Sequence, residues 1–252
     1  MPSYKITLAY DGTDYVGWQR QAAGTSIQGL LEDTLREFGD GEIPVSGAGR
    51  TDAGVHALAQ VASFSLVRAV PSDAIVRALN AKLPEAVRVT SACEVPASFH
   101  PRFDARAKTY RYRIWNGDVM PPFERRYAWH VPGALDVDAM RRAATLIEGA
   151  HDFAAFQSAG SDVATTTRTV FASALAADGS LLLYEATADG FLRHMVRAIV
   201  GSLVEVGRGR KDPEWMVRIM ASRHRSAAGR TAPACGLFLL RVDYAGARQA
   251  AP

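Results

Sequence analysis

A glycine-rich loop between two apolar segments constrains this fold more than any other feature. The loop runs from Ser46 to His56, reads SGAGRTDAGVH, and places three glycines around one carboxylate, Asp52. Strand-like residues precede it at 43–45 and follow it at 58–64. Glycine adopts positive φ at little cost and lets other groups approach the backbone closely. The stretch therefore predicts an unusually tight backbone path between two strands.

Two further side chains accompany the acid in this loop. Arg50 stands two residues before Asp52, and His56 four residues after it. Most glycine-rich loops are simple turns, but an arginine beside a carboxylate keeps the acid ionised and can also bind phosphate. We interpret His56 as a structural residue that caps the loop, because no other titratable residue is spaced to partner it in catalysis.

Size and composition are those of an ordinary globular protein. The 252 residues are 48% hydrophobic and 22% charged, which suits one large domain or two small ones. No apolar run approaches the ~18 residues that span a bilayer, and the N-terminus has no signal-peptide layout. We therefore expect a cytoplasmic protein with no membrane partner. Cys93 and Cys235 have no zinc-site or disulfide spacing, so we expect both thiols to be reduced and buried.

The first part of the chain predicts a β-α-β-β-α-β order. A T-x-x-Q capping box at Thr25 and Gln28 precedes the first helix, and Pro71 opens the second. The predicted strands are residues 4–10, 43–46, 57–66 and 87–95.

The second part repeats this order of elements. The predicted strands are 108–115, 167–175, 181–188 and 236–244, and the predicted helices are 136–148, 191–206 and 212–221. We expect an α+β fold of two ferredoxin-like, RRM-like (βαββαβ) halves, residues 1–104 and 105–252. Their strands are expected to join into one large mixed, mostly antiparallel sheet. Helices would cover one face, and an active-site cleft would lie between the halves.

One strand of the second half alternates basic and aromatic side chains in the segment AKTYRYR. Alternation places Lys108, Tyr110 and Tyr112 on one face, with Arg111 and Arg113 on the other. Aromatic rings stack on bases and arginines contact phosphates, so the strand is a candidate nucleic-acid surface. An ordinary amphipathic strand is the alternative, because strands favour tyrosine in any case.

The predicted helix 191–206 carries two arginines, Arg193 and Arg197, four residues apart on one face. Arg197 stands among residues typical of a core, and a buried arginine requires a partner, most often a carboxylate. An exposed arginine on a half-solvated helix is the alternative. The acid most in need of a cation is Asp52, so the pattern predicts an ion pair across the cleft between the halves.

A basic segment follows this helix. Its basic residues are Arg208, Arg210, Lys211, Arg218, Arg223, Arg225 and Arg230, and the only acids among them are Asp212 and Glu214. The formal net charge of the chain is only +3, so the positive field is local. Such a field suits a polyanionic partner.

Taken together, these motifs resemble the tRNA pseudouridine synthase A family. The matching residues follow the family's order and cover residues 4–244. They are YDGT at 10–13 with GWQ at 17–19, GAGRTDAGVH at 47–56, Lys108 and Tyr110, Phe191 with HMVR at 194–197, Gly201, Gly236, Leu237 and Leu239.

The resemblance implies an enzyme without metal or cofactor that acts on tRNA. The reaction would be isomerisation of uridine to pseudouridine at positions 38, 39 and 40 of the anticodon stem-loop. By resemblance, Asp52 is the catalytic nucleophile, Tyr110 stacks on the target base, Arg197 pairs with Asp52, and Arg50 helps to displace the base. A homodimer, with one tRNA contacting both subunits, is also implied. The residues expected to bind the substrate are Arg50, Lys108, Tyr110, Arg208 and Arg210.

Two other function classes compete with this interpretation. An RRM-like RNA-binding protein without catalysis would explain Tyr110 and the arginines, but not an acid caged by glycines on a basic surface. A hydrolase with Asp52 as nucleophile lacks a second acid or base near the loop, apart from His56. Within the synthase hypothesis, the sequence leaves open whether Asp52 attacks C1′ or C6 of the nucleotide or takes the C2′ proton.

Overall fold

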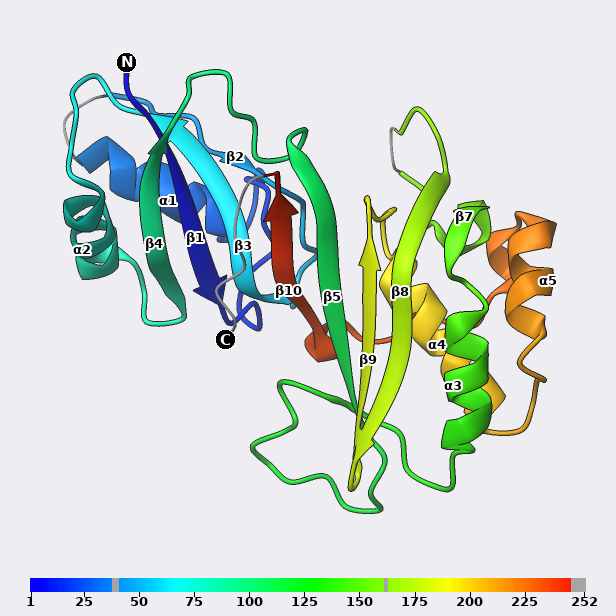
Figure 1. The fold of residues 1–252 in the computed structure, drawn as a ribbon. Coiled ribbons are helices and arrows are strands. Elements are labelled where there is room, and N and C mark those ends of the chain that lie inside the picture. Colours follow the sequence, from blue (N-terminus) through cyan, green and yellow to red (C-terminus); the bar gives the residue numbers. More distant parts are fainter. Residues whose placement is uncertain (38–40, 161–162, 246–252) are drawn as a thin grey trace. The chain divides into compact units, whose positions relative to one another are not determined.

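The computed structural model describes residues 1–37, 41–160 and 163–245 (Figure 1). The chain divides into two units. Unit 1 is Met1–Arg106 with the chain from Leu239 onward, and unit 2 is Ala107–Phe238. Each unit combines a mostly antiparallel sheet with helices. The α+β class expected from the sequence is therefore confirmed.

Unit 1 has the element order that its sequence predicts. The elements are β1 (Ser3–Tyr10), α1 (Ile27–Leu35), β2 (Ser46–Gly47), β3 (His56–Ser65), α2 (Ser72–Lys82) and β4 (Val87–Val95). The strands pair antiparallel in the order β4-β1-β3, with β2 beside β3. This order, with the last strand beside the first, is that of a ferredoxin-like unit.

The core of unit 1 lies on the helix side of this sheet. Along β1, alternate side chains are buried because successive residues of a strand point to opposite faces. In Figure 1, α1 and α2 lie beside each other next to these strands. The buried side chains, each contributing roughly 1.5–3 kcal/mol, include Tyr4, Ile6, Leu8, Ile27, Leu31, Leu35, Ile75 and Leu79.

Two local predictions in unit 1 differ from the structure. The N-cap of α1 is Ser26 instead of Thr25, and its Oγ accepts a hydrogen bond from the Gly29 N–H at 3.1 Å. Gln28 forms no capping box, because its side chain bonds to Arg20 and Val45. The strand before the glycine-rich loop is also shorter than predicted, being only the two residues of β2.

Unit 2 also combines strands and helices. Its elements are β5 (Ala105–Trp115), β6 (Trp129–His130), α3 (Val137–Thr145), β7 (Gly149–Asp152), β8 (Thr167–Asp178), β9 (Leu181–Ala188), α4 (Met195–Gly207) and α5 (Trp215–Ser222). Strands pair antiparallel in the order β5-β9-β8-β7, and β6 pairs parallel with β5. Asp136 caps α3 by accepting from the Ala139 N–H at 2.8 Å.

The last strand, β10 (Leu237–Tyr244), was expected in a second half of residues 105–252. From Leu239 onward the chain groups with unit 1. The cleft expected between the halves concerns how the two units sit together and stays a prediction.

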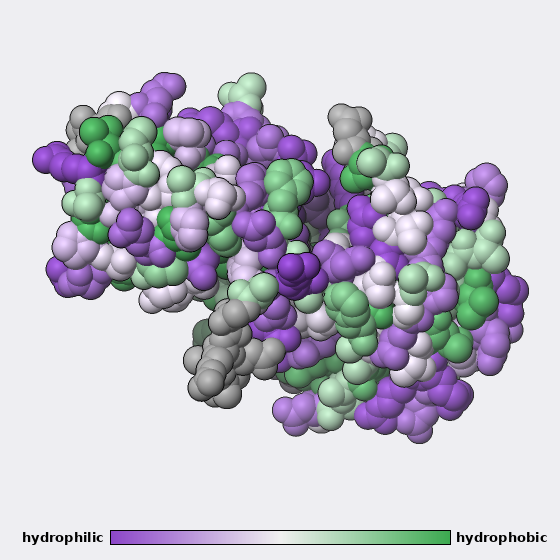
Figure 2. Space-filling model, turned by 45° about the horizontal axis from the view of Figure 1, so that its top comes forward, coloured by the Kyte–Doolittle hydropathy of each residue, from purple (hydrophilic) through white to green (hydrophobic). Residues whose placement is uncertain are grey.

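The prediction that both cysteines are buried is wrong. Cys93 is exposed and Cys235 is half-buried. Cys93 lies on β4, where the side chains after Val89 no longer reach the core. On the face drawn in Figure 2, hydrophilic and hydrophobic residues are interspersed. Among the described helices, none has the length and apolar character needed to cross a bilayer.

Candidate active site

The loop that carries Asp52 lies directly against the loop that follows β1. A Cβ atom on Gly12 would stand 2.0 Å from the carbonyl oxygen of Val55, and one on Gly17 would stand 2.5 Å from that of Thr51. No larger residue fits either position, since real Cβ contacts are never so short. These two glycines therefore allow the two loop backbones to touch.

Backbone hydrogen bonds fasten the same two loops. The Trp18 N–H donates to the Thr51 carbonyl at 3.0 Å, and the Gly54 N–H donates to the Tyr15 carbonyl at 3.3 Å. Gly54 has φ of +76°, a conformation that favours glycine. The indole of Trp18 is buried where only a glycine at position 47 leaves room for it. The glycines of both loops thus allow the close packing of one loop against the other.

His56 links the end of the Asp52 loop to the Asp11–Gly12 turn. Its side chain is buried, and its Nδ1 accepts a hydrogen bond from the Gly12 N–H at 3.0 Å. An Asp11 carboxylate oxygen lies 3.1 Å from the same nitrogen. These contacts agree with the structural role that we inferred for His56.

Exposure alternates at the centre of the loop. Arg50 is exposed, Thr51 is buried and Asp52 is half-buried. The Thr51 hydroxyl points inward, where it lies 2.8 Å from the hydroxyl of Tyr10. Gln60 donates to the Gly49 carbonyl at 2.8 Å. Burial raises the pKa of Tyr10 to about 12, so its hydroxyl keeps its proton at neutral pH.

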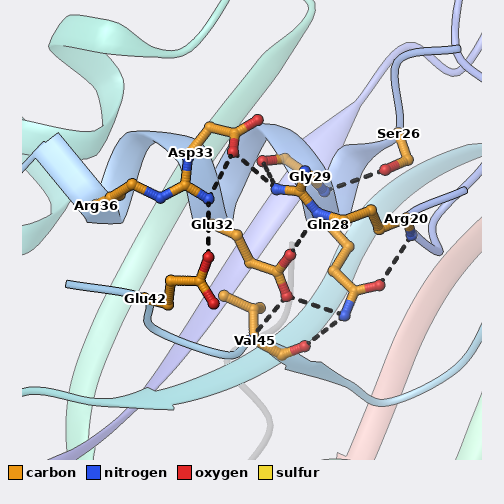
Figure 3. Close-up of polar contacts among 9 residues, drawn as sticks. All are labelled: Arg20, Ser26, Gln28, Gly29, Glu32, Asp33, Arg36, Glu42 and Val45. Carbon is orange, nitrogen blue, oxygen red and sulfur yellow. Dashed lines mark hydrogen bonds and ion pairs between the residues drawn. The ribbon is translucent and has the colours of Figure 1, made fainter. Parts of the chain in front are cut away.

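A second polar network braces the entrance to the loop (Figure 3). Arg20 donates to Glu32 and Asp33 on α1, both at 2.8 Å. Gln28 donates to the carbonyl of Val45 at 2.9 Å and accepts from the Arg20 N–H at 3.0 Å. The side chains of α1 therefore hold the residue that immediately precedes β2 and the glycine-rich loop.

In unit 2, Tyr110 is fixed by an aromatic contact. The side chain is 7% exposed, and its ring meets that of Phe191 edge-on at a centroid distance of 5.0 Å. Tyr112, two residues further along β5, is fully buried and donates to the Pro233 carbonyl at 2.7 Å. Of the two tyrosines predicted on this face, only Tyr110 keeps any exposed surface.

Arg197 is anchored by the segment that crosses α4. Its Nε donates to the Ala232 carbonyl at 2.7 Å, and the Ala232 N–H donates back to the Arg197 carbonyl at 3.0 Å. A Cβ on Gly201 would stand 1.7 Å from the Arg230 carbonyl oxygen, so glycine permits this crossing. The side chain of Arg197 is half-buried, which corrects the expectation of full burial.

Arg193 does not share a helix face with Arg197. The helix α4 begins only at Met195, because His194 adopts a left-handed conformation with φ of 62°. Arg193 instead reaches the Ala159 carbonyl at 2.9 Å, and the His194 ring meets the Ser158 hydroxyl at 2.8 Å. A non-glycine residue at such φ is strained and is common at functional sites.

Most of the arginines expected to meet phosphate have acidic partners within unit 2. On β5, Arg111 pairs with Glu185 and Arg113 with Glu124. In the basic segment, Arg208 and Arg210 both form ion pairs with Glu205. Two more pairs are Arg218–Asp212 at 2.6 Å and Arg223–Asp152 at 3.1 Å. Their pairing weakens the local positive field below what the sequence alone indicates.

A pocket of about 340 Å³ lies in unit 1, but it does not include Asp52. Its lining includes Ser3, Ile43, Ser46 and Ser65, and its one charged residue, Glu42, is highly exposed. Because the other polar side chains that line it are serines and none of these is a titratable group, we place the candidate site at the Asp52 loop. Within the described ranges, no three acidic, histidine or cysteine side chains gather closely enough for a metal ion.

Several supporting residues were not singled out from the sequence. Tyr10 lies in the YDGT motif, but its role as a partner of Thr51 depends on strand pairing between β1 and β3. Gln60 and Ala232 act through bonds to or from the backbone. Of these residues, only Tyr10 could have been found from the sequence, because it belongs to the YDGT motif.

Comparison with known proteins identifies relatives along nearly the whole chain. A family model described as tRNA pseudouridine synthase matches residues 6–104 and 143–245. A protein from Moorella thermoacetica (strain ATCC 39073 / JCM 9320) named tRNA pseudouridine synthase A is 48% identical over 246 residues, covering 97% of this chain and 100% of that protein. Its namesake from Pelobacter propionicus (strain DSM 2379 / NBRC 103807 / OttBd1) is 44% identical over 244 residues, with the same coverage. A third, from Methylacidiphilum infernorum (isolate V4), is 48% identical over 242 residues, which are 96% of this chain and 95% of that protein.

Proposed function

Because this chain belongs to the tRNA pseudouridine synthase family, we propose that it isomerises uridine at positions 38, 39 and 40 of the tRNA anticodon stem-loop. The observation that carries this proposal is the Asp52 loop, which presents a half-buried carboxylate beside an exposed Arg50. Family membership disfavours the alternative of an RNA-binding protein without catalysis.

The reaction detaches C1′ of the ribose from N1 of uracil and attaches it to C5. N1 gains a proton, C5 loses one, and no electrons are gained or lost overall. An ionised carboxylate can serve this chemistry by attacking C1′ or C6, or by taking the C2′ proton. We assign the carboxylate role to Asp52 and leave these three routes open.

We assign the remaining roles by resemblance to the family. Tyr110 stacks on the target base, and its contact with Phe191 supports this role by fixing the ring. Arg50 helps to displace the base from the stem, since a base inside a helix must be flipped out before it can react. Arg197 pairs with Asp52, and Lys108 contacts the substrate.

Two further properties also rest on the family resemblance. We propose that the enzyme acts as a homodimer with one tRNA contacting both subunits, and that it works in the cytoplasm. The paired arginines Arg208 and Arg210 would bind tRNA phosphates, with Glu205 reducing their combined charge.

The test is to map pseudouridine in an unmodified tRNA transcript after incubation with the purified protein. Carbodiimide adducts on pseudouridine stop reverse transcriptase, and we expect new stops at positions 38, 39 and 40. A transcript with cytidine at these positions is the matched control and should give none. Pseudouridine only at other positions would refute the assigned target. Release of free uracil would indicate a hydrolase.

A further inference from the structure

Three buried polar side chains lie beneath the centre of the Asp52 loop. Tyr10, Thr51 and Gln60 are 4%, 6% and 0% exposed. The Tyr10 and Thr51 hydroxyls are 2.8 Å apart, and the Gln60 Nε2 lies 3.5 Å from the Tyr10 hydroxyl. We call these three residues the Tyr10–Thr51–Gln60 network.

The network holds the chain on both sides of Arg50. Gln60 donates to the carbonyl of Gly49, the residue before Arg50. Tyr10 bonds to the side chain of Thr51, the residue after it. Because Thr51 is held inward, its two neighbours keep their side chains outside the core, with Arg50 exposed and Asp52 half-buried.

The hydrogen bonds of the Tyr10–Thr51–Gln60 network favour a single orientation of the Asp52 loop. Burying a hydroxyl or an amide without a partner costs free energy, so each of these groups is tied to the orientation in which its bond forms. Rotation of the loop about Thr51 would break the bond to Tyr10 and leave both hydroxyls buried without each other. The network therefore opposes the loop motion that would turn Asp52 away.

We propose that the Tyr10–Thr51–Gln60 network positions Asp52 and Arg50 for the isomerisation, and that its loss lowers turnover while leaving tRNA affinity intact. The inference rests on the proposed role of Asp52. All three members are positioning residues, because they act through the loop and not on the substrate.

A second hydroxyl pair in the protein provides a matched control. In unit 2, the hydroxyl of the fully buried Tyr184 lies 2.9 Å from that of Ser173. Tyr184→Phe removes a buried hydrogen bond of the same kind as Tyr10→Phe does. If the Tyr10 bond served only stability, the two substitutions would have the same consequences.

The experiment compares Tyr10→Phe, Thr51→Val, their double variant, Thr51→Ser and Tyr184→Phe. Single-turnover rate, tRNA Kd and melting temperature are measured for each. We expect Tyr10→Phe and Thr51→Val each to lower the rate about 10- to 100-fold, as small misplacements of reacting groups do. The double variant should be no slower than the slower single variant, because both remove the same bond. Kd should stay within about twofold of wild type, since neither side chain is exposed to substrate.

Two variants separate positioning from stability. Thr51→Ser keeps the hydroxyl and should retain nearly the wild-type rate, whereas Tyr184→Phe should lower the melting temperature and leave the rate unchanged. Equal rates for wild type, Thr51→Val and Tyr10→Phe would overturn the inference. So would a rate loss in Tyr184→Phe as large as that in Tyr10→Phe. Should Tyr10→Phe not fold, the Thr51→Val and Thr51→Ser pair still decides the question.

Failure of the proposed function gives a different result. A wild-type protein that forms no pseudouridine would overturn both the function and the inference. An active Asp52→Asn protein would overturn the role of Asp52, and the inference that rests on it. Wild-type activity with an inactive Asp52→Asn protein and a fully active Thr51→Val protein would overturn the inference alone.

Discussion

The backbone of Gly17 lies so close to Thr51 that a Cβ atom at position 17 would stand 2.5 Å from the Thr51 carbonyl oxygen. The glycine also has φ of +104°. Thr51 is the residue before Asp52. A substitution at Gly17 would therefore displace the Asp52 loop without changing any side chain of that loop.

We predict that Gly17→Ala lowers stability by about 3 kcal/mol and greatly reduces activity, because it combines backbone strain with steric overlap. The matched control is Gly133→Ala, since Gly133 has φ of +87° but nothing within 4 Å of the added atom. Gly133→Ala should lower stability by only about 1 kcal/mol, the cost of backbone strain at positive φ. Urea unfolding and pseudouridine formation are measured for both. Equal losses in the two variants would contradict the close-contact argument.

Asp52→Asn should abolish turnover and leave tRNA binding intact. The substitution preserves size and removes the charge on which every route of the reaction depends. It also removes a negative charge from a site that we propose faces tRNA phosphates, so affinity should hold or rise. Pseudouridine formation and tRNA Kd are the measurements. Residual activity within ~10-fold of wild type would exclude Asp52 as the nucleophile, since single catalytic groups usually contribute more.

Much of unit 1 could be predicted from its sequence because its signals are local. Alternation along β1 and the apolar faces of its helices follow from burial of one side of each element. The N-cap at Ser26 instead of Thr25 could not be predicted, because the Gln28 side chain that would complete a capping box bonds instead to Val45, seventeen positions away. Assignment of the chain from Leu239 to unit 1 likewise depends on packing between distant segments.

The candidate site shows the same division. Composition and spacing singled out Asp52 and Arg50 as candidates, because an acid and an arginine stand together among glycines in one loop. The late start of α4 could not be anticipated, since the left-handed φ of 62° at His194 accompanies a contact with Ser158, a residue 36 positions earlier in the chain. The acidic partners of Arg208 and Arg210 were missed because their shared Glu205 precedes the segment that appeared basic.

Stability should fall at alkaline pH through buried tyrosines. Burial raises the pKa of Tyr10 to about 12 and also raises the pKa of Tyr112 and of Tyr184. In the unfolded chain these groups ionise near pH 10, so above that pH the unfolded state binds fewer protons than the native state. The free energy of unfolding should then fall by about 1.4 kcal/mol per pH unit for each such tyrosine, with no such slope below about pH 9.

Urea unfolding from pH 8 to 11 measures this dependence. Tyr184→Phe should reduce the alkaline slope by one proton, because it removes one group that ionises only on unfolding. A slope that is identical in the wild type and in Tyr184→Phe would show that this tyrosine does not contribute.

Binding of tRNA should weaken with salt in a way that depends on Arg208 and Arg210. Each phosphate contact adds about 0.7 to 0.9 to the steepness of log K against log salt. Charge reversal of both arginines to Glu should flatten this dependence. The control is Glu205→Gln, which removes their shared partner and should leave affinity equal or stronger. An unchanged slope after charge reversal would mean that these arginines only form a solvated, internally paired surface.

Arg197 should be required for turnover because of its geometry as well as its charge. Its Nε–H bonds to the Ala232 carbonyl at 2.7 Å, which fixes the plane of the guanidinium, a rigid fork of N–H donors. A carboxylate binds such a fork through two parallel hydrogen bonds. Arg197→Lys keeps the charge but loses both the anchoring donor and the fork, so we expect activity to fall about 100-fold while the fold survives.

Arg197→Met should reduce activity further with little change in stability, because removing a half-buried charge offsets the loss of its pairing. The matched control is Arg141→Lys on α3, where an arginine Nε also donates to a backbone carbonyl, that of Leu175 at 3.3 Å. This control should keep full activity, since it changes the same kind of hydrogen bond at a residue that we do not assign to the site. Single-turnover rates and urea midpoints are compared for all three proteins. A fully active Arg197→Met enzyme would rule out the ion pair that we predict between Arg197 and Asp52.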